Sequence, residues 1–138
     1  MGTGRSGRCI NTKGSQTSSA IKNLPEGWHA VGIFYNIPIL RPNDPKQSLS
    51  LPRNSKIPNV SYLLYGKNGV FKQLRIFGED NKPKADIDYH IKDGKMSLHK
   101  HIYIDGIRQK EHIDLTSTKY DNYKKFIEKV FEKWMVWR

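Results

Sequence analysis

The stretch KADIDYHIKDGKMSLHKHIYI, residues 84–104, decides the fold of this 138-residue chain. Apolar and polar residues alternate on both sides of Asp93-Gly94, a pattern typical of a β-hairpin closed by a two-residue type I′ turn. A loop of that length pairs Lys92 with Lys95 and so sets the register of both strands. The hairpin is therefore expected to have one apolar face and one polar face.

The polar face of this hairpin collects an unusual set of side chains. The register places Asp86 opposite His101, Asp88 opposite His99, and His90 opposite Ser97. Two carboxylates and three imidazoles then share one surface, because alternate residues of a strand point to the same side. We expect the functional site on this face.

The composition points to a basic, soluble, single-domain protein. With 24 Lys and Arg against 13 Asp and Glu, the net charge is +11, which favours polyanionic partners, nucleic acid first. The alternative is a lysine-rich surface without specific function. The sequence shows no apolar run long enough to span a membrane and no signal peptide. A single cysteine excludes an internal disulfide scaffold.

The chain divides into a tail and one domain. Residues 1–22 are rich in Gly, Ser and Thr and are expected to form a disordered linker, whereas residues 23–138 form the domain. The prolines of residues 29–45 make a central strand there unlikely. Five antiparallel strands are expected at Asn59–Tyr65, Val70–Gly78, Lys84–Ile91, Met96–Ile104 and Ile107–Asp114. An amphipathic helix is expected over Thr116–Arg138.

These elements predict an α+β fold, an antiparallel meander with the C-terminal helix packed on its apolar face and with an open polar face. A second two-residue turn at Asp105-Gly106 would extend the polar face onto a third strand. It pairs Tyr103 with Arg108, His101 with Lys110, His99 with His112, and Ser97 with Asp114. The alternation in Val70–Gly78 adds Gln73 and Arg75 to the same face.

Clustered histidine and arginine on a sheet can cleave RNA without a metal or other cofactor. One imidazole takes the proton of the ribose 2′-hydroxyl and the other protonates the leaving 5′-oxygen, since imidazole titrates near neutral pH. We assign these steps to His99 and His101. Asp86 and Asp88 would orient the two rings, and Arg75 or Arg108 would stabilise the phosphate charge. Substrate contacts are assigned to His90, Gln73, Tyr103, Arg108, Lys110 and His112.

Two other interpretations use the same residues. Asp86 and Asp88 facing His99 and His101 would supply two carboxylates and two nitrogens to one metal ion, as in a metal-dependent nuclease. Alternatively, the side chains form exposed cross-strand pairs worth about 0.2–1 kcal/mol each. A protein that binds nucleic acid without cleaving it, or a phage structural module, is then possible.

Residues 51–104 also resemble a known family. The family pattern, LP-x-N-G-x-PN followed by Q-x-R-x-aromatic, DID-aromatic and PH-x-H-aromatic, belongs to a C-terminal domain of bacterial polymorphic toxins and some phage minor-head-type proteins. The matching residues are Leu51, Pro52, Asn54, Pro58, Asn59, Gln73, Arg75, Phe77, Asp86, Ile87, Asp88, Tyr89, His99, His101 and Tyr103. The sequence departs from the pattern at Ser55, at Leu98 and after Tyr89, where His90 and Asp93-Gly94 replace Asp-His-Gly.

The resemblance implies a toxin module, a nuclease of the barnase, EndoU, colicin or RelE kind whose substrate is RNA, with tRNA among the candidates. It implies an acidic immunity protein that covers the basic face and a parent delivery protein on the N-terminal side. It also implies a bacterial effector that is secreted or delivered and acts in the cytoplasm of a target cell. Without delivery, a cytoplasmic or phage-associated protein is expected.

Overall fold

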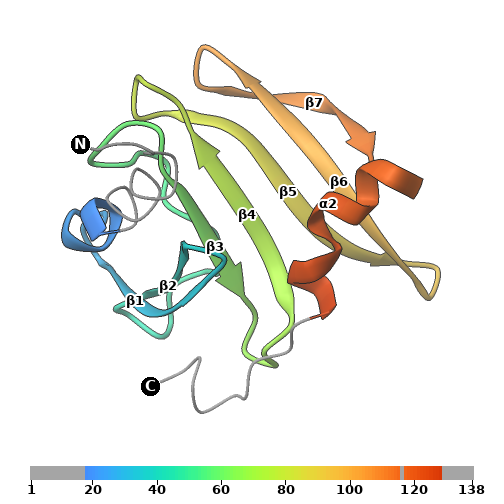
Figure 1. Ribbon diagram of the computed structural model, residues 1–138, viewed down its shortest axis with the longest axis horizontal. Helices are drawn as coiled ribbons and strands as arrows, with labels where there is room; N and C mark the ends of the chain where they lie inside the picture. Colours follow the sequence, from blue (N-terminus) through green and yellow to red (C-terminus); the bar gives the residue numbers. More distant parts are fainter. Residues whose placement is uncertain (1–17, 116, 129–138) are drawn as a thin grey trace, which may run out of the picture.

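Seven strands form one sheet in which the spatial order follows the chain order (Figure 1). The computed structural model describes residues 18–115 and 117–128. Its elements are β1 (Trp28–Phe34), β2 (Ile37–Pro42), β3 (Ser61–Tyr65), β4 (Phe71–Phe77), β5 (Pro83–Lys92), β6 (Lys95–Ile104), β7 (Ile107–Asp114) and α2 (Ser117–Glu128). All neighbouring strands are antiparallel except β2 and β3, which are parallel. The sheet is therefore mixed and open.

The five strands expected from the sequence are present as β3 to β7, but the expected strand count is too low. Strands β1 and β2 form an additional hairpin around Tyr35 and Asn36, whose φ angles are 52° and 63°. This turn has the backbone of a type I′ turn without the glycine that marks such turns in a sequence. Strand β2 contains Pro38 and still has a neighbour on each side, so the expectation from the prolines is wrong. Its recorded pairing with β3 is a single position, Ile39 opposite Leu63.

The central hairpin has the predicted register. Both turn residues have positive φ, 53° at Asp93 and 75° at Gly94, as a type I′ turn requires. Lys92 lies opposite Lys95, and the three polar pairs of the hairpin follow as expected. Glycine is favoured at position 94 because residues with a side chain are strained in this backbone conformation.

The register of the next hairpin is correct only near its turn. Tyr103 pairs with Arg108, but an irregularity follows, and His101 pairs with His112 rather than with Lys110. Two extra residues of β7 are accommodated there, so the following positions shift by two and His99 lies opposite Asp114. The shift is even, so each residue beyond it keeps its face of the sheet while its partner changes.

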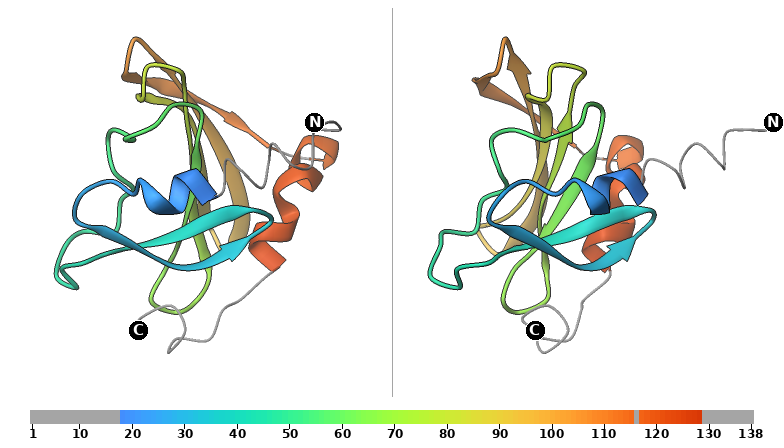
Figure 2. Two further views of the ribbon diagram at one scale, coloured as in Figure 1. Left: turned by 60° about the vertical axis from the view of Figure 1, so that its left-hand side comes forward. Right: turned by 90° about the vertical axis from the view of Figure 1, so that its left-hand side faces the viewer.

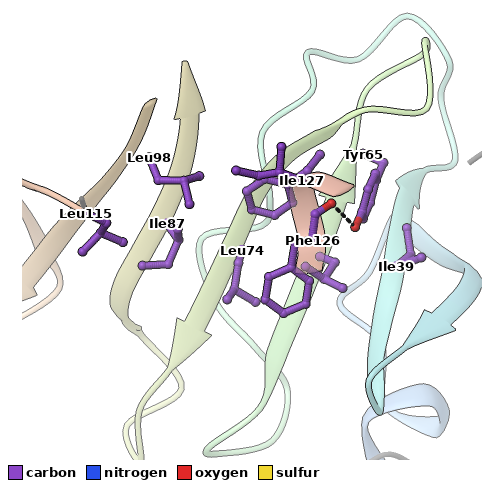
Figure 3. Close-up of a cluster of buried hydrophobic side chains, with 10 residues drawn as sticks. Ile39, Tyr65, Leu74, Ile87, Leu98, Leu115, Phe126 and Ile127 are labelled. Atoms are coloured by element: carbon purple, nitrogen blue, oxygen red, sulfur yellow. Dashed lines mark hydrogen bonds between the residues drawn. The ribbon is translucent and has the colours of Figure 1, made fainter. Parts of the chain in front are cut away.

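Helix α2 packs on one face of the sheet and encloses the larger core (Figure 3). Leu74, Ile87 and Leu98 come from three neighbouring strands and are at most 4% exposed. The ring of Phe126 stacks on that of Phe71 with centroids 5.8 Å apart. The hydroxyl of Tyr65, on β3, donates a hydrogen bond of 2.8 Å to the carbonyl oxygen of the same phenylalanine. These contacts fix the helix over the middle of the sheet.

A second core lies on the opposite face, which the sequence predicted to be open. Residues 18–22 form a helical turn, and Ala20 within it is 3% exposed. Trp28, Leu51 and Tyr62 are also buried there. Figure 2 shows the chain after β2 on the side of the sheet away from α2. The folded domain therefore begins before position 23, and part of the polar face lies beneath this segment.

The cover provided by α2 is also smaller than expected. The described helix ends at Glu128, and the rest of the predicted helix, residues 129–138, lies outside the described residues. The apolar face that the helix was expected to cover includes the isoleucines at positions 102, 104, 107 and 113, and these are between 42% and 67% exposed. One corner of the apolar face, formed by β6 and β7, thus faces solvent.

The packing of α2 predicts a large effect of truncating its buried phenylalanine. Phe126→Ala should lower the free energy of unfolding by about 3–5 kcal/mol, because it removes a buried ring that contacts two strands. Denaturant unfolding monitored by circular dichroism measures the loss. The matched control is Lys124→Ala on the exposed side of the same helix, which should change stability by less than about 0.5 kcal/mol. Equal effects would contradict the packing.

Candidate active site

Four neighbouring strands bring a set of polar side chains together on the face opposite α2. We call this set the polar cluster. It comprises Gln73, Arg75, Asp86, Asp88, His99, His101, Tyr103, Arg108 and Asp114. The β4–β5 register, with Gln73 opposite Asp88 and Arg75 opposite Asp86, places the β4 residues on the predicted face. The cluster has a buried end on β4 and β5 and a more exposed end on β6 and β7.

The buried end is organised around an ion pair between Arg75 and Asp86, which are 5% and 0% exposed. The guanidinium contacts both carboxylate oxygens, with Nε to Oδ1 at 2.8 Å and Nη2 to Oδ2 at 3.0 Å. Nη1 donates to the carbonyl oxygens of Leu51 and Pro52, at 2.6 and 3.0 Å. Nη2 also donates to the hydroxyl of Tyr103 at 3.2 Å. These five contacts match the five N–H donors of an arginine.

This arrangement changes the roles expected for two residues. Arg75 was expected to bind phosphate, but its donors are directed to protein oxygens and the side chain is buried. Burial lowers its pKa, but the hydrogen bond and the negative charge of Asp86 outweigh it, so the pKa is raised overall. Asp86 was expected to orient His101, but it accepts from Arg75 and from Tyr103, whose hydroxyl lies 2.7 Å from Oδ2. Both residues serve the structure here.

Asp88 joins the buried end of the polar cluster to the exposed end. Its Oδ1 accepts a hydrogen bond of 3.1 Å from Nε2 of Gln73. The Oε1 atom of Gln73 in turn accepts a hydrogen bond of 3.2 Å from the backbone N–H of Leu51. Its Oδ2 pairs with the guanidinium of Arg108 and lies 3.6 Å from Nε2 of His101. Gln73, expected to contact substrate, is instead buried and holds the carboxylate in place.

His99 has a carboxylate partner of its own. Its Nε2 lies 3.1 Å from Oδ1 of Asp114 on β7 and 3.4 Å from the hydroxyl of Ser97. The ring of His90 is tilted beside it, with centroids 4.9 Å apart. The imidazole of His99 is 16% exposed, similar to the 13% of His101. Two histidines of β6 therefore each contact a different carboxylate near the protein surface.

The predicted backbone pairs are correct, but the side chains do not contact the residues directly opposite. Asp88 lies opposite His99 and contacts His101, and Asp86 lies opposite His101 and contacts Tyr103. Both carboxylates reach two positions further along β6. Diagonal neighbours come within side-chain reach in a twisted sheet, which explains a common shift in one direction.

Four residues assigned to substrate contacts lie in different positions relative to the polar cluster, namely His90, Arg108, Lys110 and His112. Arg108 reaches the cluster, and its side chain is 40% exposed. His90 is exposed beside His99. Lys110 is exposed but falls in the irregular part of β7, away from the position opposite His101. The backbone of His112 lies there instead, and its side chain is outside the described part of the structure.

Asp114 is a candidate site residue that sequence reasoning missed. It was expected opposite Ser97 because the second hairpin was read without an irregularity. The segment Gln109–Glu111 carries no glycine or proline that would indicate a shift. A shift of two residues leaves the alternation of polar and apolar positions unchanged, so only the structure distinguishes the two registers.

The set of metal ligands proposed as an alternative is not assembled in the described residues. The carboxylate of Asp86 is occupied by Arg75 and Tyr103, while Asp88 is paired with Arg108. Within residues 18–115 and 117–128, no group of three or more His, Cys, Asp or Glu side chains is arranged to hold an ion. The side-chain arrangement therefore favours ion pairing over metal coordination.

Comparisons with family models, with curated proteins and with solved structures give no match for this chain. Among the described helices, none has the length and apolar character required to cross a membrane. The geometry of the polar cluster and the net charge of +11 are therefore the observations that bear on function.

The buried ion pair predicts a strongly non-additive pair of substitutions. Arg75→Met should cost about 3–5 kcal/mol of stability, because it leaves the charge of Asp86 buried without its partner. Adding Asp86→Leu should restore part of that loss, since no uncompensated charge then remains. Denaturant unfolding of both single variants and the double variant gives the coupling energy. Arg53→Met, at an exposed arginine, is the control. Additive losses would contradict a direct pair.

The environment of Tyr103 predicts a stability change at alkaline pH. Burial, followed by the hydrogen bond to Asp86, raises the pKa of this phenol from 10.0 to about 12. The neutral form thus stabilises the fold, fully below pH 10 and progressively less as the pH rises through 12. Unfolding measured between pH 9 and 12 should show a smaller decline for Tyr103→Phe than for the wild type. Tyr35→Phe, at a 59% exposed tyrosine, should retain the wild-type slope.

Proposed function

We propose that this protein is a metal-independent ribonuclease in which His99 and His101 transfer protons. The observation that carries the proposal is the pairing of each imidazole with a different carboxylate on one face of β6, at 3.1 Å from Asp114 and 3.6 Å from Asp88. A carboxylate beside an imidazole orients the ring and stabilises its protonated form. Two such rings meet the need of RNA cleavage for one base and one acid.

The proposed reaction needs only the RNA and these side chains. One imidazole removes the proton of the 2′-hydroxyl, whose oxygen forms a bond to the adjacent phosphorus. The bond from phosphorus to the 5′-oxygen breaks, and the second imidazole supplies the proton that this leaving group takes up. The products are a 2′,3′-cyclic phosphate and a free 5′-hydroxyl. The two histidines exchange protonation states and return to the start when the cyclic ester is hydrolysed.

Arg108 is the cation best placed to stabilise the negative charge of the transition state. It is bound to Asp88 beside the histidines and is 40% exposed, whereas Arg75 is buried. A preorganised cation near the developing charge lowers the barrier because it requires no reorganisation during the reaction. The net charge of +11 would also attract the RNA over a distance.

The wider role proposed for this activity is that of a toxin domain. The resemblance of residues 51–104 to polymorphic-toxin domains supports this role, and an acidic immunity protein would complement the basic charge. Delivery by a larger protein and action on tRNA or other RNA in a target cytoplasm belong to the same proposal. Expression of the domain in cells should then arrest growth only while the histidines are intact.

The ribonuclease proposal predicts large losses on removing either imidazole. His99→Ala and His101→Ala should each lower the rate of RNA cleavage by about 10²–10⁴-fold, the usual contribution of general acid–base catalysis. His29→Ala is the matched control, since this histidine bonds Asn43 at 2.7 Å outside the cluster and its loss should leave the rate unchanged. Purified protein and total RNA, analysed on denaturing gels, provide the measurement.

The same assay distinguishes the alternatives. Cleavage that is abolished by a chelator would support a metal-dependent nuclease. Salt-dependent RNA binding without cleavage, for which the net charge provides a reason, would support a binding module. Equal activity of the wild type and both histidine variants would overturn the assignment of His99 and His101.

A further inference from the structure

Four isoleucines form an exposed apolar surface on the same face of the sheet as α2. This isoleucine patch consists of Ile102 (42% exposed), Ile104 (58%), Ile107 (67%) and Ile113 (42%). Ile102 and Ile104 lie an even number of residues after Leu98 on β6, so they share its face, and Leu98 belongs to the core beneath α2. Ile107 lies opposite Ile104, and Ile113 lies opposite Lys100, which places both on the same face. None of the four belongs to that core. The sheet thus continues beyond its helical cover as an apolar surface.

The patch is hollowed rather than flat. A depression of about 660 Å³ lies between β6 and β7, lined by the four isoleucines together with Lys100, Arg108 and residues 109–111. It coincides with the register shift of β7, where the two strands cease to pair regularly. A hollow of this size, lined with aliphatic side chains, accommodates a large apolar side chain from a partner.

The edge position of β7 makes the patch accessible. This strand is the last of the sheet, with β6 as its only neighbour among the described residues. Edge strands with exposed aliphatic side chains are sites of association, which proteins limit with lysines and irregular pairing. Both features are present here, as Lys110 and as the shift in register. The lysine and the register shift hinder the pairing of another strand with the edge of β7. Binding of a partner is then expected at the hollow.

We propose that the isoleucine patch docks an acidic partner protein, which inserts an apolar side chain into the hollow and places carboxylates against Lys100 and Lys110. Neither lysine forms an ion pair with a described residue, whereas Arg108 is already bound to Asp88. Glu111 is the single acidic residue of the lining. A second copy of the chain would bring another +11 charge to this surface, so charge favours an acidic partner over self-association.

The four isoleucines lie on the face opposite the polar cluster, and Arg108 is the one member of that cluster that also borders the hollow. Leu98 and the isoleucines of β6 occupy alternate positions to His99, His101 and Tyr103, which point the other way. A partner bound at the isoleucine patch would leave the two histidines accessible. The inference therefore does not rest on the proposed ribonuclease activity, and either can fail alone.

The test uses the whole protein with labelled isoleucine methyl groups and a synthetic probe. The probe is a peptide of about ten residues in which leucine and glutamate alternate, long enough to extend along β7. Its addition should shift the methyl signals of the four patch isoleucines in nuclear magnetic resonance spectra. Replacing its leucines with serine, or its glutamates with lysine, should abolish the shifts if apolar and acidic groups are both required.

Substitutions in the protein sharpen the test. Ile107→Ser with Ile113→Ser should weaken binding of the probe by about tenfold or more, since both side chains line the hollow. Ile33→Ser is the matched control, because this isoleucine is 49% exposed on the opposite edge strand, β1. RNA cleavage, measured in parallel, should be unaffected by these variants.

Several results would overturn the proposal. Unchanged isoleucine signals, or equal binding by the serine-containing probe, would exclude a specific apolar and acidic site. Signals that shift with protein concentration alone would identify a second copy as the occupant. Sedimentation with anionic lipid vesicles, lost in the Ile107→Ser and Ile113→Ser double variant, would identify a membrane surface instead.

Discussion

The buried ion pair between Arg75 and Asp86 is the constraint on which the arrangement of the polar face depends. Removing two charges from water costs several kcal/mol per ion unless hydrogen bonds replace the lost hydration. The guanidinium meets this condition with contacts to Asp86, Tyr103 and the carbonyl oxygens of Leu51 and Pro52. The pair therefore links three strands to the segment after β2. It explains why a face rich in charged residues is largely buried at β4 and β5.

The Arg75–Asp86 ion pair also divides the polar face into a buried half and a more exposed half. With Arg75 and Asp86 committed to each other, Asp88 is the carboxylate that extends toward β6 and β7. Gln73 holds one oxygen of Asp88 from the buried side, and Arg108 and His101 approach the other. The more exposed half then consists of side chains on β6 and β7, where Asp114 pairs with His99. The proposed proton transfer would use the fixed orientation that these contacts give the two imidazoles.

The sequence alone predicts much of this geometry because two hairpins carry their own turn signals. Asp93-Gly94 and Asp105-Gly106 each adopt the positive φ angles that set the register. Periodicity then assigns every side chain of β5 and β6 to a face. The remaining features depend on tertiary structure. The shift in β7 has no local signal, and the burial of Arg75 depends on Leu51 and Pro52, more than twenty residues away in the chain. Sequence patterning shows which residues share a face but not which of them the chain later covers.

The chemistry of the RNA ends tests the central claim most directly. If two histidines transfer protons without a metal, cleavage in the presence of a chelator should yield 2′,3′-cyclic phosphate and 5′-hydroxyl termini. Mass spectrometry of the fragments identifies these groups, and their formation should depend on both His99 and His101. Fragments with 5′-phosphate and 3′-hydroxyl termini, formed only when a divalent metal is present, would contradict the account.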